Sequence, residues 1–305
     1  MPRSRARSAA VLLLGLLLVS CGGDPSVAPS PSSSVPAYAV RFASYDFPEN
    51  QILAEVYAEA ARRAGLPVEV EHGIGTREVV SPALMQGLVD VVIDYTGTAL
   101  SFAEPDVSPA KRSPEDLQIT LERSLRPHGI TVLRAAEAED KNGFVVTAAF
   151  AAEHEVAALS DLESFASGLR FGAPPECPDR PFCLPGLEKV YGLRFAEVSA
   201  MPSRAATGQA LLTGQIDVGM LETTDARLSG SGLVLLDDDA RLQPHESVVP
   251  LVRTEALDRF GPSLRKALED TSARLTTADL IELNWAVELE GLTPAQAAAR
   301  WWDSV

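Results

Sequence analysis

Two polar segments, each directly after a predicted buried strand, carry side chains that can hold a small polar ligand. The first is Tyr95-Thr96-Gly97-Thr98 and the second is Glu222-Thr223-Thr224-Asp225. In open α/β sheets, ligands bind just beyond the carboxyl ends of the strands. We therefore expect these two turns to line one binding site, with the ring of Tyr95 on one side and the carboxylate of Glu222 on the other.

The same local pattern positions both turns. Ala-Leu-x-x-Gly-x-x-Asp-Val occurs at residues 83–91 and again at 210–218. Glycine suits the end of a helix, where a left-handed residue without a Cβ is least strained. The segment Val89–Ile93 is β-branched except for Asp90, which is typical of a strand that is covered on both faces. We interpret each copy as a helix end, a glycine stop, a buried strand and a polar turn; the alternative is a chance match of a short pattern.

Helix and strand patterns alternate along the rest of the chain. Strands are predicted at 38–43, 68–70, 89–93, 130–133, 144–146, 169–172, 233–236 and 248–252, and helices at 49–64, from 76, 114–125, from 159, 187–191 and over most of 254–305. Such alternation favours parallel sheets covered by helices. We expect an α/β, bilobed, periplasmic-binding-protein-like fold with lobe 1 at 39–140 plus 246–305 and lobe 2 at 141–245. Two crossing segments would form a hinge, with the ligand cleft between the lobes.

The N-terminus has the pattern of an export signal. Three arginines precede the apolar run Ala9–Val19, which is too short to span a bilayer, and Ser20 precedes Cys21. Leu18-Val19-Ser20-Cys21 resembles a bacterial lipobox, which implies a signal peptide at 1–20, a lipidated Cys21 and a flexible tether through residue 38. We expect the protein at the extracytoplasmic face of the membrane, anchored at Cys21. An ordinary cleaved signal is the alternative.

Two further cysteines, Cys177 and Cys183, lie close together in a protein expected to meet an oxidising environment. A local disulfide between them is predicted, and its short loop suggests that it shapes the loop more than it holds the fold. The four histidines show no metal-ligand spacing, and no GxSxG or HExxH motif is present. Gly73-Ile74-Gly75-Thr76 lacks the third glycine of a dinucleotide fingerprint and the lysine of a P-loop. We therefore expect no metal, no cofactor and no enzymatic activity.

The net charge is −16. Such a surface repels nucleic acid, so nucleic acid is not an expected partner. General solubility and attraction of cationic ligands are both consistent with this charge.

Several longer motifs resemble those of a known family. They include residues 44–57, Gly-Ile-Gly-Thr-Arg-Glu, Asp-Tyr-Thr-Gly-Thr-Ala-Leu and Gly-Ala-Pro-Pro-Glu-Cys-Pro-Asp-Arg-Pro. In this order they resemble the glycine betaine, choline and osmoprotectant-binding lipoproteins of ABC importers that have the OpuAC-type domain. The resemblance covers the chain from about Ala39 and implies a small-molecule solute, an ABC permease with its ATPase, and a monomer.

The resemblance also implies ligand-binding roles for particular residues. In the family, an aromatic box holds a quaternary ammonium group, which has no N–H to donate and is attracted by ring faces and carboxylates. Tyr95 matches a box tyrosine, Thr98 a polar contact and Asp140 an acidic neighbour. Glu176 and Arg180 match a charged pair, in which the planar guanidinium would meet the ligand's carboxylate; a structural ion pair between the two is the alternative.

Other positions depart from the family's pattern. Asn142, Glu222 and His245 stand where further box aromatics are frequent, Tyr45 where lysine is common, and Asn50 where glutamine is common. We expect a box reduced to one certain tyrosine, with Glu222 and Asp140 supplying negative charge and Tyr45 supplying a second ring. The sequence therefore predicts a receptor for a cationic or zwitterionic solute. The alternative is a sensor or assembly lipoprotein that retains the fold and binds another polar ligand or a protein.

Overall fold

A computed structural model describes residues 39–230 and 232–305. The predicted signal, Cys21 and the tether therefore lie outside the described residues. Among the helices that the structure describes, none is long and apolar enough to cross a membrane.

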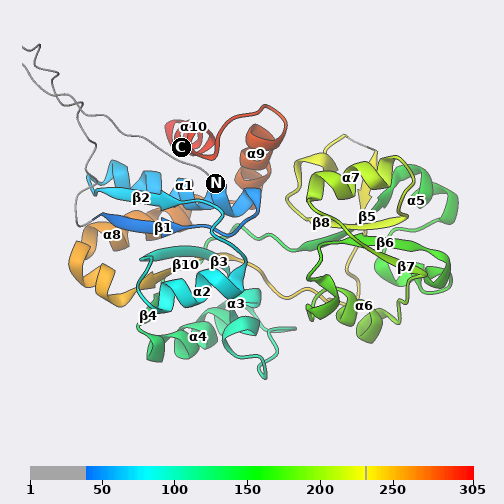
Figure 1. The fold of residues 1–305 in the computed structure, drawn as a ribbon, viewed down its shortest axis with the longest axis horizontal. Helices are drawn as coiled ribbons and strands as arrows, with labels where there is room; N and C mark the ends of the chain where they lie inside the picture. Colours follow the sequence, from blue (N-terminus) through cyan, green and yellow to red (C-terminus); the bar gives the residue numbers. More distant parts are fainter. Residues whose placement is uncertain (1–38, 231) are drawn as a thin grey trace, which may run out of the picture. The chain divides into compact units, whose positions relative to one another are not determined.

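The described chain forms two five-stranded sheets (Figure 1). The first has the order β2-β1-β3-β10-β4, with β1 at Val40–Ala43, β2 at Val68–Glu71, β3 at Val91–Tyr95, β4 at Ile130–Val132 and β10 at Val248–Arg253. The second has the order β7-β6-β8-β5-β9, with β5 at Asn142–Thr147, β6 at Arg170–Ala173, β7 at Glu197–Ala200, β8 at Val218–Glu222 and β9 at Leu233–Leu235.

Both sheets combine parallel and antiparallel strands in the same way. β1 is parallel to β2 and β3, while β10 is antiparallel to β3 and β4. Likewise, β6 is parallel to β7 and β8, while β5 is antiparallel to β8 and β9. The prediction of parallel sheets therefore holds for three strands of each sheet and is wrong for the antiparallel strand that joins them to the fifth. Each sheet receives an antiparallel strand, β5 or β10, where the chain enters it from the other sheet.

Helices cover both faces of the first sheet. The helices are α1 Pro48–Arg63, α2 Arg77–Met85, α3 Thr96–Ala103, α4 Pro114–Leu125, α5 Ala148–His154, α6 Leu184–Tyr191, α7 Arg204–Leu212, α8 Thr254–Arg274, α9 Thr277–Glu288 and α10 Pro294–Ser304. In Figure 1, α1 lies on one face of the first sheet, with α9 and α10 on the same side, and α2, α3 and α4 lie on the other face. The predicted helical C-terminal region is confirmed, whereas the predicted helix start at residue 159 is a short 3-10 helix, Leu159–Leu162.

Strand β3 is buried along its whole length, and its apolar side chains pack on both faces of the sheet. Val91, Ile93 and Tyr95 pack against the α1 side of the sheet, while Val92 packs against the α2 to α4 side. The strand begins later than predicted and includes Tyr95, and α3 begins at Thr96. The expected polar turn after this strand is therefore wrong, because the strand continues directly into a helix. The ring of Tyr95 thus lies at the carboxyl end of the central strand.

The repeated pattern corresponds to a repeated structure. Gly87 and Gly214 both adopt positive φ, 75° and 68°, after their helices. Asp90 accepts from the backbone N of Arg41 (3.1 Å) and from its Nε (3.0 Å). Asp217 accepts from the same two atoms of Arg170, at 2.8 and 3.0 Å. The repeated aspartate thus ties each central strand to its parallel neighbour, which explains why both copies contain it.

Candidate ligand-binding site

A cavity of about 260 Å³ is lined by residues of both lobes. Most of the sequence-predicted site residues line it, namely Tyr45, Tyr95, Thr98, Asp140, Asn142, Glu176, Arg180 and Glu222. Sequence reasoning missed other lining residues, notably Phe47, Arg77, Phe102, Phe182, Arg204 and Glu246. Asn50 and His245 are not among the lining residues.

The lining is richer in aromatic rings than the sequence suggested. The rings of Tyr45 and Phe47 are stacked with centroids 6.1 Å apart, and Phe47 stacks on Tyr95 at 6.3 Å. Phe102 and Phe182 also face the cavity. The cavity therefore has more rings along its wall than the single certain tyrosine that we expected to hold the ligand. Phe47 could have been found from the sequence, because alternate residues of an extended segment point to the same side.

A guanidinium lies at the Tyr45 end of this aromatic row. Arg77 is the first residue of α2 and lies over the Tyr45 ring, with Cζ 4.7 Å from the centroid. Its Nε and Nη2 donate to Asp94, at 3.1 and 2.5 Å, and the Tyr45 hydroxyl donates to the same carboxylate at 2.5 Å. Burial lowers the pKa of Arg77, but Asp94 outweighs it, so the net pKa is raised and the group stays charged. Tyr45, which stands at a position where lysine is common, therefore has a cation beside it.

Arg180 belongs to the same end of the cavity. It pairs with Glu78, the neighbour of Arg77 in α2, at 2.7 Å, and this half-exposed ion pair joins the two lobes. The structural ion pair with Glu176, which the sequence left open as an alternative, is not the one formed. Glu78 and Arg180 are far apart in the sequence, so no local signal indicated their contact.

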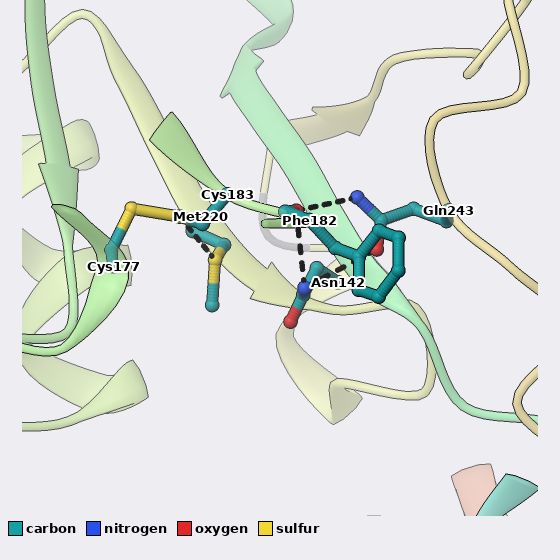
Figure 2. Close-up of a disulfide and its surroundings, with 6 residues drawn as sticks. All are labelled: Asn142, Cys177, Phe182, Cys183, Met220 and Gln243. Atoms are coloured by element: carbon teal, nitrogen blue, oxygen red, sulfur yellow. Dashed lines mark hydrogen bonds between the residues drawn. A yellow bond between two sulfur atoms is a disulfide. The ribbon is translucent and has the colours of Figure 1, made fainter. Parts of the chain in front are cut away.

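The loop that carries Arg180 is closed by a disulfide between Cys177 and Cys183, with a Cα–Cα distance of 5.3 Å (Figure 2). The carbonyl of Phe182 accepts from Asn142 Nδ2 at 3.3 Å and from Gln243 Nε2 at 2.8 Å, as Figure 2 shows. Asn142 therefore holds the loop in addition to lining the cavity.

Acidic groups gather at the Tyr95 end of the row. Asp140 and Glu222 both line the cavity, and the pairing of β5 with β8 places Asn142 opposite Glu222. Thr223 Oγ1 and the backbone N of Thr224 donate to Asp140 Oδ1 at 3.0 and 3.3 Å. Burial raises the pKa of Asp140 well above its ordinary value and that of Glu222 to about 7. Arg204 Nε donates to Glu222 Oε1, so the negative charge of Glu222 is partly compensated.

Glu49 connects this end of the cavity to both lobes. Its Oε1 accepts from the Tyr95 hydroxyl at 2.6 Å. Its Oε2 accepts from Thr224 Oγ1 at 2.5 Å and from Asn284 Nδ2 at 2.7 Å. Because Thr224 belongs to the second lobe, these bonds fix the orientation of the Tyr95 ring and join the lobes behind it.

Glu246 lines the cavity, whereas its neighbour His245, which we expected to line it, does not. Glu246 Oε2 accepts from the backbone N of Gly97 and of Thr98, both at 3.0 Å, and the Thr98 hydroxyl donates to Oε1 at 2.5 Å. A side chain at Gly97 would prevent this approach, since a Cβ there would lie 2.8 Å from the carbonyl oxygen of His245. The ring of His245 points away and contacts Glu139 (Nδ1···Oε1, 2.7 Å).

Asn50 has a structural role away from the cavity. Its Oδ1 accepts from the backbone N of Tyr45 at 2.8 Å, and its Nδ2 donates to the carbonyl of Ile93 at 2.8 Å. It therefore links the segment that carries Tyr45 to strand β3. Within residues 39–230 and 232–305, no cluster of three or more His, Cys, Asp or Glu side chains could hold a metal ion.

Two lobes with matching sheets around one polar and aromatic cavity define a solute-binding protein. A solved structure described as a glycine betaine/carnitine/choline ABC transporter has the same fold, with a TM-score of 0.72 and 22% identity over 87% of this chain and 98% of that one. Residues 39–304 match the OpuAC family, described as the substrate binding domain of an ABC-type glycine betaine transport system, and the chain belongs to this family.

Two relatives match over most of their length. The glycine-betaine-binding protein of Pseudomonas aeruginosa is 26% identical, over 86% of both chains. The glycine betaine-binding protein YehZ of Escherichia coli is 24% identical, over 82% of this chain and 85% of its own. The chain is thus similar to glycine betaine-binding proteins along most of its length.

Proposed function

We propose that the cavity captures a small zwitterionic or cationic solute, for delivery to an ABC permease and its ATPase. The observation that carries this proposal is the polarity of the aromatic row. Arg77 lies over Tyr45 at one end, Phe47 stacks in the middle, and Tyr95 at the other end is surrounded by acidic groups. A ligand with a carboxylate and an ammonium group would place its charges at opposite ends and its carbon skeleton against the rings.

The charged groups at the two ends of the cavity support this orientation. Burial raises the pKa of Tyr95 well above its ordinary value, and the nearby carboxylates Glu49, Asp140 and Glu222 raise it further. Acidic side chains are therefore concentrated at that end of the cavity, where a cationic group would favour their ionised forms. Ring faces attract cations as well, by about 0.5–2 kcal/mol for each well-placed contact. At the opposite end, Arg77 and Arg180 provide planar donors suited to a carboxylate.

Isothermal titration calorimetry with betaines, choline, carnitine and amino-acid derivatives tests the proposal. We expect at least one of these solutes to bind, and Tyr95→Ala to weaken that binding at least tenfold. Phe150→Ala serves as the control, because Phe150 packs on the aromatic rings of His154 and Phe165 and does not line the cavity. Absence of binding throughout the panel, or wild-type binding by Tyr95→Ala, would contradict the proposal.

We also propose that lipid at Cys21 holds the protein at the extracytoplasmic face of the membrane. The support is the order of charged, apolar and lipobox-like segments before Cys21. Expression in a bacterial host with radiolabelled palmitate should label the wild type but not Cys21→Ser, and the variant should appear in the soluble extracytoplasmic fraction. Labelling of both proteins would show that Cys21 is not the anchor.

Ligand capture is proposed to involve closure of lobe 1 (39–140 plus 246–305) on lobe 2 (141–245), within a monomer. The cross-lobe bonds Arg180–Glu78 and Thr224–Glu49 support this, because both link the lobes directly beside the cavity. Small-angle scattering should show a smaller radius of gyration with ligand. Light scattering should give the mass of one chain in both states.

A further inference from the structure

The acidic end of the cavity contains acceptor atoms that no protein group uses. Both hydrogen bonds to Asp140 go to its Oδ1, and the Arg204 Nε bond goes to Oε1 of Glu222. Among the residues that the structure describes, none donates a hydrogen bond to Asp140 Oδ2 or to Glu222 Oε2. Since both residues line the cavity, these two oxygens are available to a ligand.

The backbone holds the two acceptors close together. Asn142 is paired with Glu222 in the sheet, the Thr223 N donates to the Lys141 carbonyl at 2.9 Å, and the Lys141 N donates to Thr223 Oγ1 at 2.9 Å. Asp140 and Glu222 therefore flank a fixed crossing of two chain segments, and neither backbone can shift without breaking this ladder.

The charges around Asp140 and Glu222 favour a ligand that donates a hydrogen bond to them. Arg204 compensates Glu222, whereas both oxygens of Glu49 are already occupied by Tyr95, Thr224 and Asn284. Asp140 is almost completely buried and has only uncharged donors. Because Asp140 and Glu222 line the cavity, a ligand N–H can reach their second oxygens and form a charge-assisted hydrogen bond that no protein group in the described chain supplies. A quaternary ammonium covers such oxygens with methyl groups and donates no hydrogen bond.

Glu222 and Tyr95 occupy equivalent positions in the two copies of the repeat. It is the last residue of β8, and Tyr95 is the last residue of β3 in the matching copy of the repeat. The second lobe therefore presents a hydrogen-bond acceptor at the place where the first lobe presents a ring. Methyl groups pack well on a ring, whereas an N–H group requires an acceptor.

We infer, building on the proposed function, that the cationic group of the ligand carries at least one N–H, and that Asp140 and Glu222 select it against quaternary amines. The ligand class is thus an incompletely methylated amine, primary, secondary or tertiary, with or without a carboxylate at the other end.

Calorimetry at pH 8 with pairs of solutes tests this inference. In each pair, one member has a quaternary nitrogen and the other has a nitrogen that carries an N–H when protonated. Suitable pairs are dimethylglycine with glycine betaine, dimethylaminoethanol with choline, and proline with proline betaine. In at least one pair, the N–H member should bind about tenfold or more tightly, because one charge-assisted hydrogen bond corresponds to at least that factor. If the quaternary member binds equally or more tightly in every pair that binds, the inference fails while the proposed function stands. If no member binds, the proposed function itself fails.

Variants then test the two carboxylates. Glu222→Gln and Asp140→Asn should each reduce the preference for the N–H member to about threefold or less, and Glu222→Tyr should reverse it. Glu153→Gln, an exposed carboxylate of α5, is the matched control and should preserve the preference. Thermal unfolding establishes that each variant is folded. An unchanged preference in folded Glu222→Gln and Glu222→Tyr would overturn the role of Glu222.

Discussion

Reduction of the Cys177–Cys183 disulfide is expected to lower the free energy of unfolding by only about 2 kcal/mol, because the cross-link closes a very short loop. The sequence separation of the two cysteines is 6. The chain-entropy relation gives about 2 kcal/mol for a loop of this size, compared with nearly 5 for a loop of about 100 residues. In a chain of this size, 2 kcal/mol corresponds to a shift in Tm of roughly 3–4 °C.

The loop should also keep its shape after reduction. The carbonyl of Phe182 still accepts from Asn142 and Gln243, and both sulfur atoms remain buried in the core of the second lobe. Ligand affinity is therefore expected to fall by less than about threefold, since the two hydrogen bonds to the loop, each contributing about 1 kcal/mol, are retained.

Equilibrium urea unfolding of the wild type, with and without a reductant, measures the effect of the cross-link alone. Reduction keeps both sulfur atoms in place, whereas Cys177→Ala/Cys183→Ala also leaves a packing defect and should be somewhat less stable still. Calorimetry on the reduced protein gives the affinity. A loss of stability above about 5 kcal/mol would show that the disulfide holds the whole lobe. A large loss of affinity at intact stability would show that the hydrogen bonds do not hold the loop.

Three further perturbations follow from the structure. Phe47→Leu should weaken binding of a cationic ligand by about 3- to 30-fold in calorimetry, because the ring face is lost. The control Phe150→Leu should bind the ligand as the wild type does. Equal affinities of Phe47→Leu and the wild type would show that the ligand does not contact Phe47. Burial raises the pKa of Glu246 from 4.5 to about 7, so the folded state holds this proton more tightly than the unfolded chain does. Glu246 should therefore contribute a loss of stability of up to about 3 kcal/mol as pH rises from 4.5 to 7, and urea unfolding of Glu246→Gln should show a fall smaller than that of the wild type by this amount. Asp90→Asn should lower the free energy of unfolding by about 2 kcal/mol, and Asp217→Asn by about 1 kcal/mol, as measured by urea unfolding. The reason is burial, because the Asp90 side chain is 4% exposed and that of Asp217 is 23% exposed. A larger loss for Asp217→Asn would contradict this prediction.

The architecture could be predicted because its signals are local. The glycine stops, the buried strands and the aspartates at 90 and 217 recur in one short pattern, and each has a local physical reason. Extending the same alignment would also have found Arg77 and Arg204, the first residues of α2 and α7. Both guanidiniums line the cavity, and each pairs with a carboxylate near the end of the following strand.

The missed and misplaced residues have equally physical reasons. His245 and Glu246 are neighbours in an extended segment, where consecutive side chains point to opposite sides, so an error of one residue exchanges the cavity face for the solvent face. Asn50 was assigned from resemblance, whereas its hydrogen bonds are used within the fold. The Arg180–Glu78 and Thr224–Glu49 contacts form only when the two lobes meet, and neither has a signature in the surrounding sequence.

The placement of Tyr95 and Glu222 at the last position of their strands has an evolutionary consequence. Their backbones are paired within the sheets, opposite Val248 and Asn142, while their side chains reach the cavity. Such a position can accept a new side chain without a change in the sheet. Single substitutions at either position can therefore change the preferred solute while both sheets remain intact, so solute preference can evolve without loss of the fold.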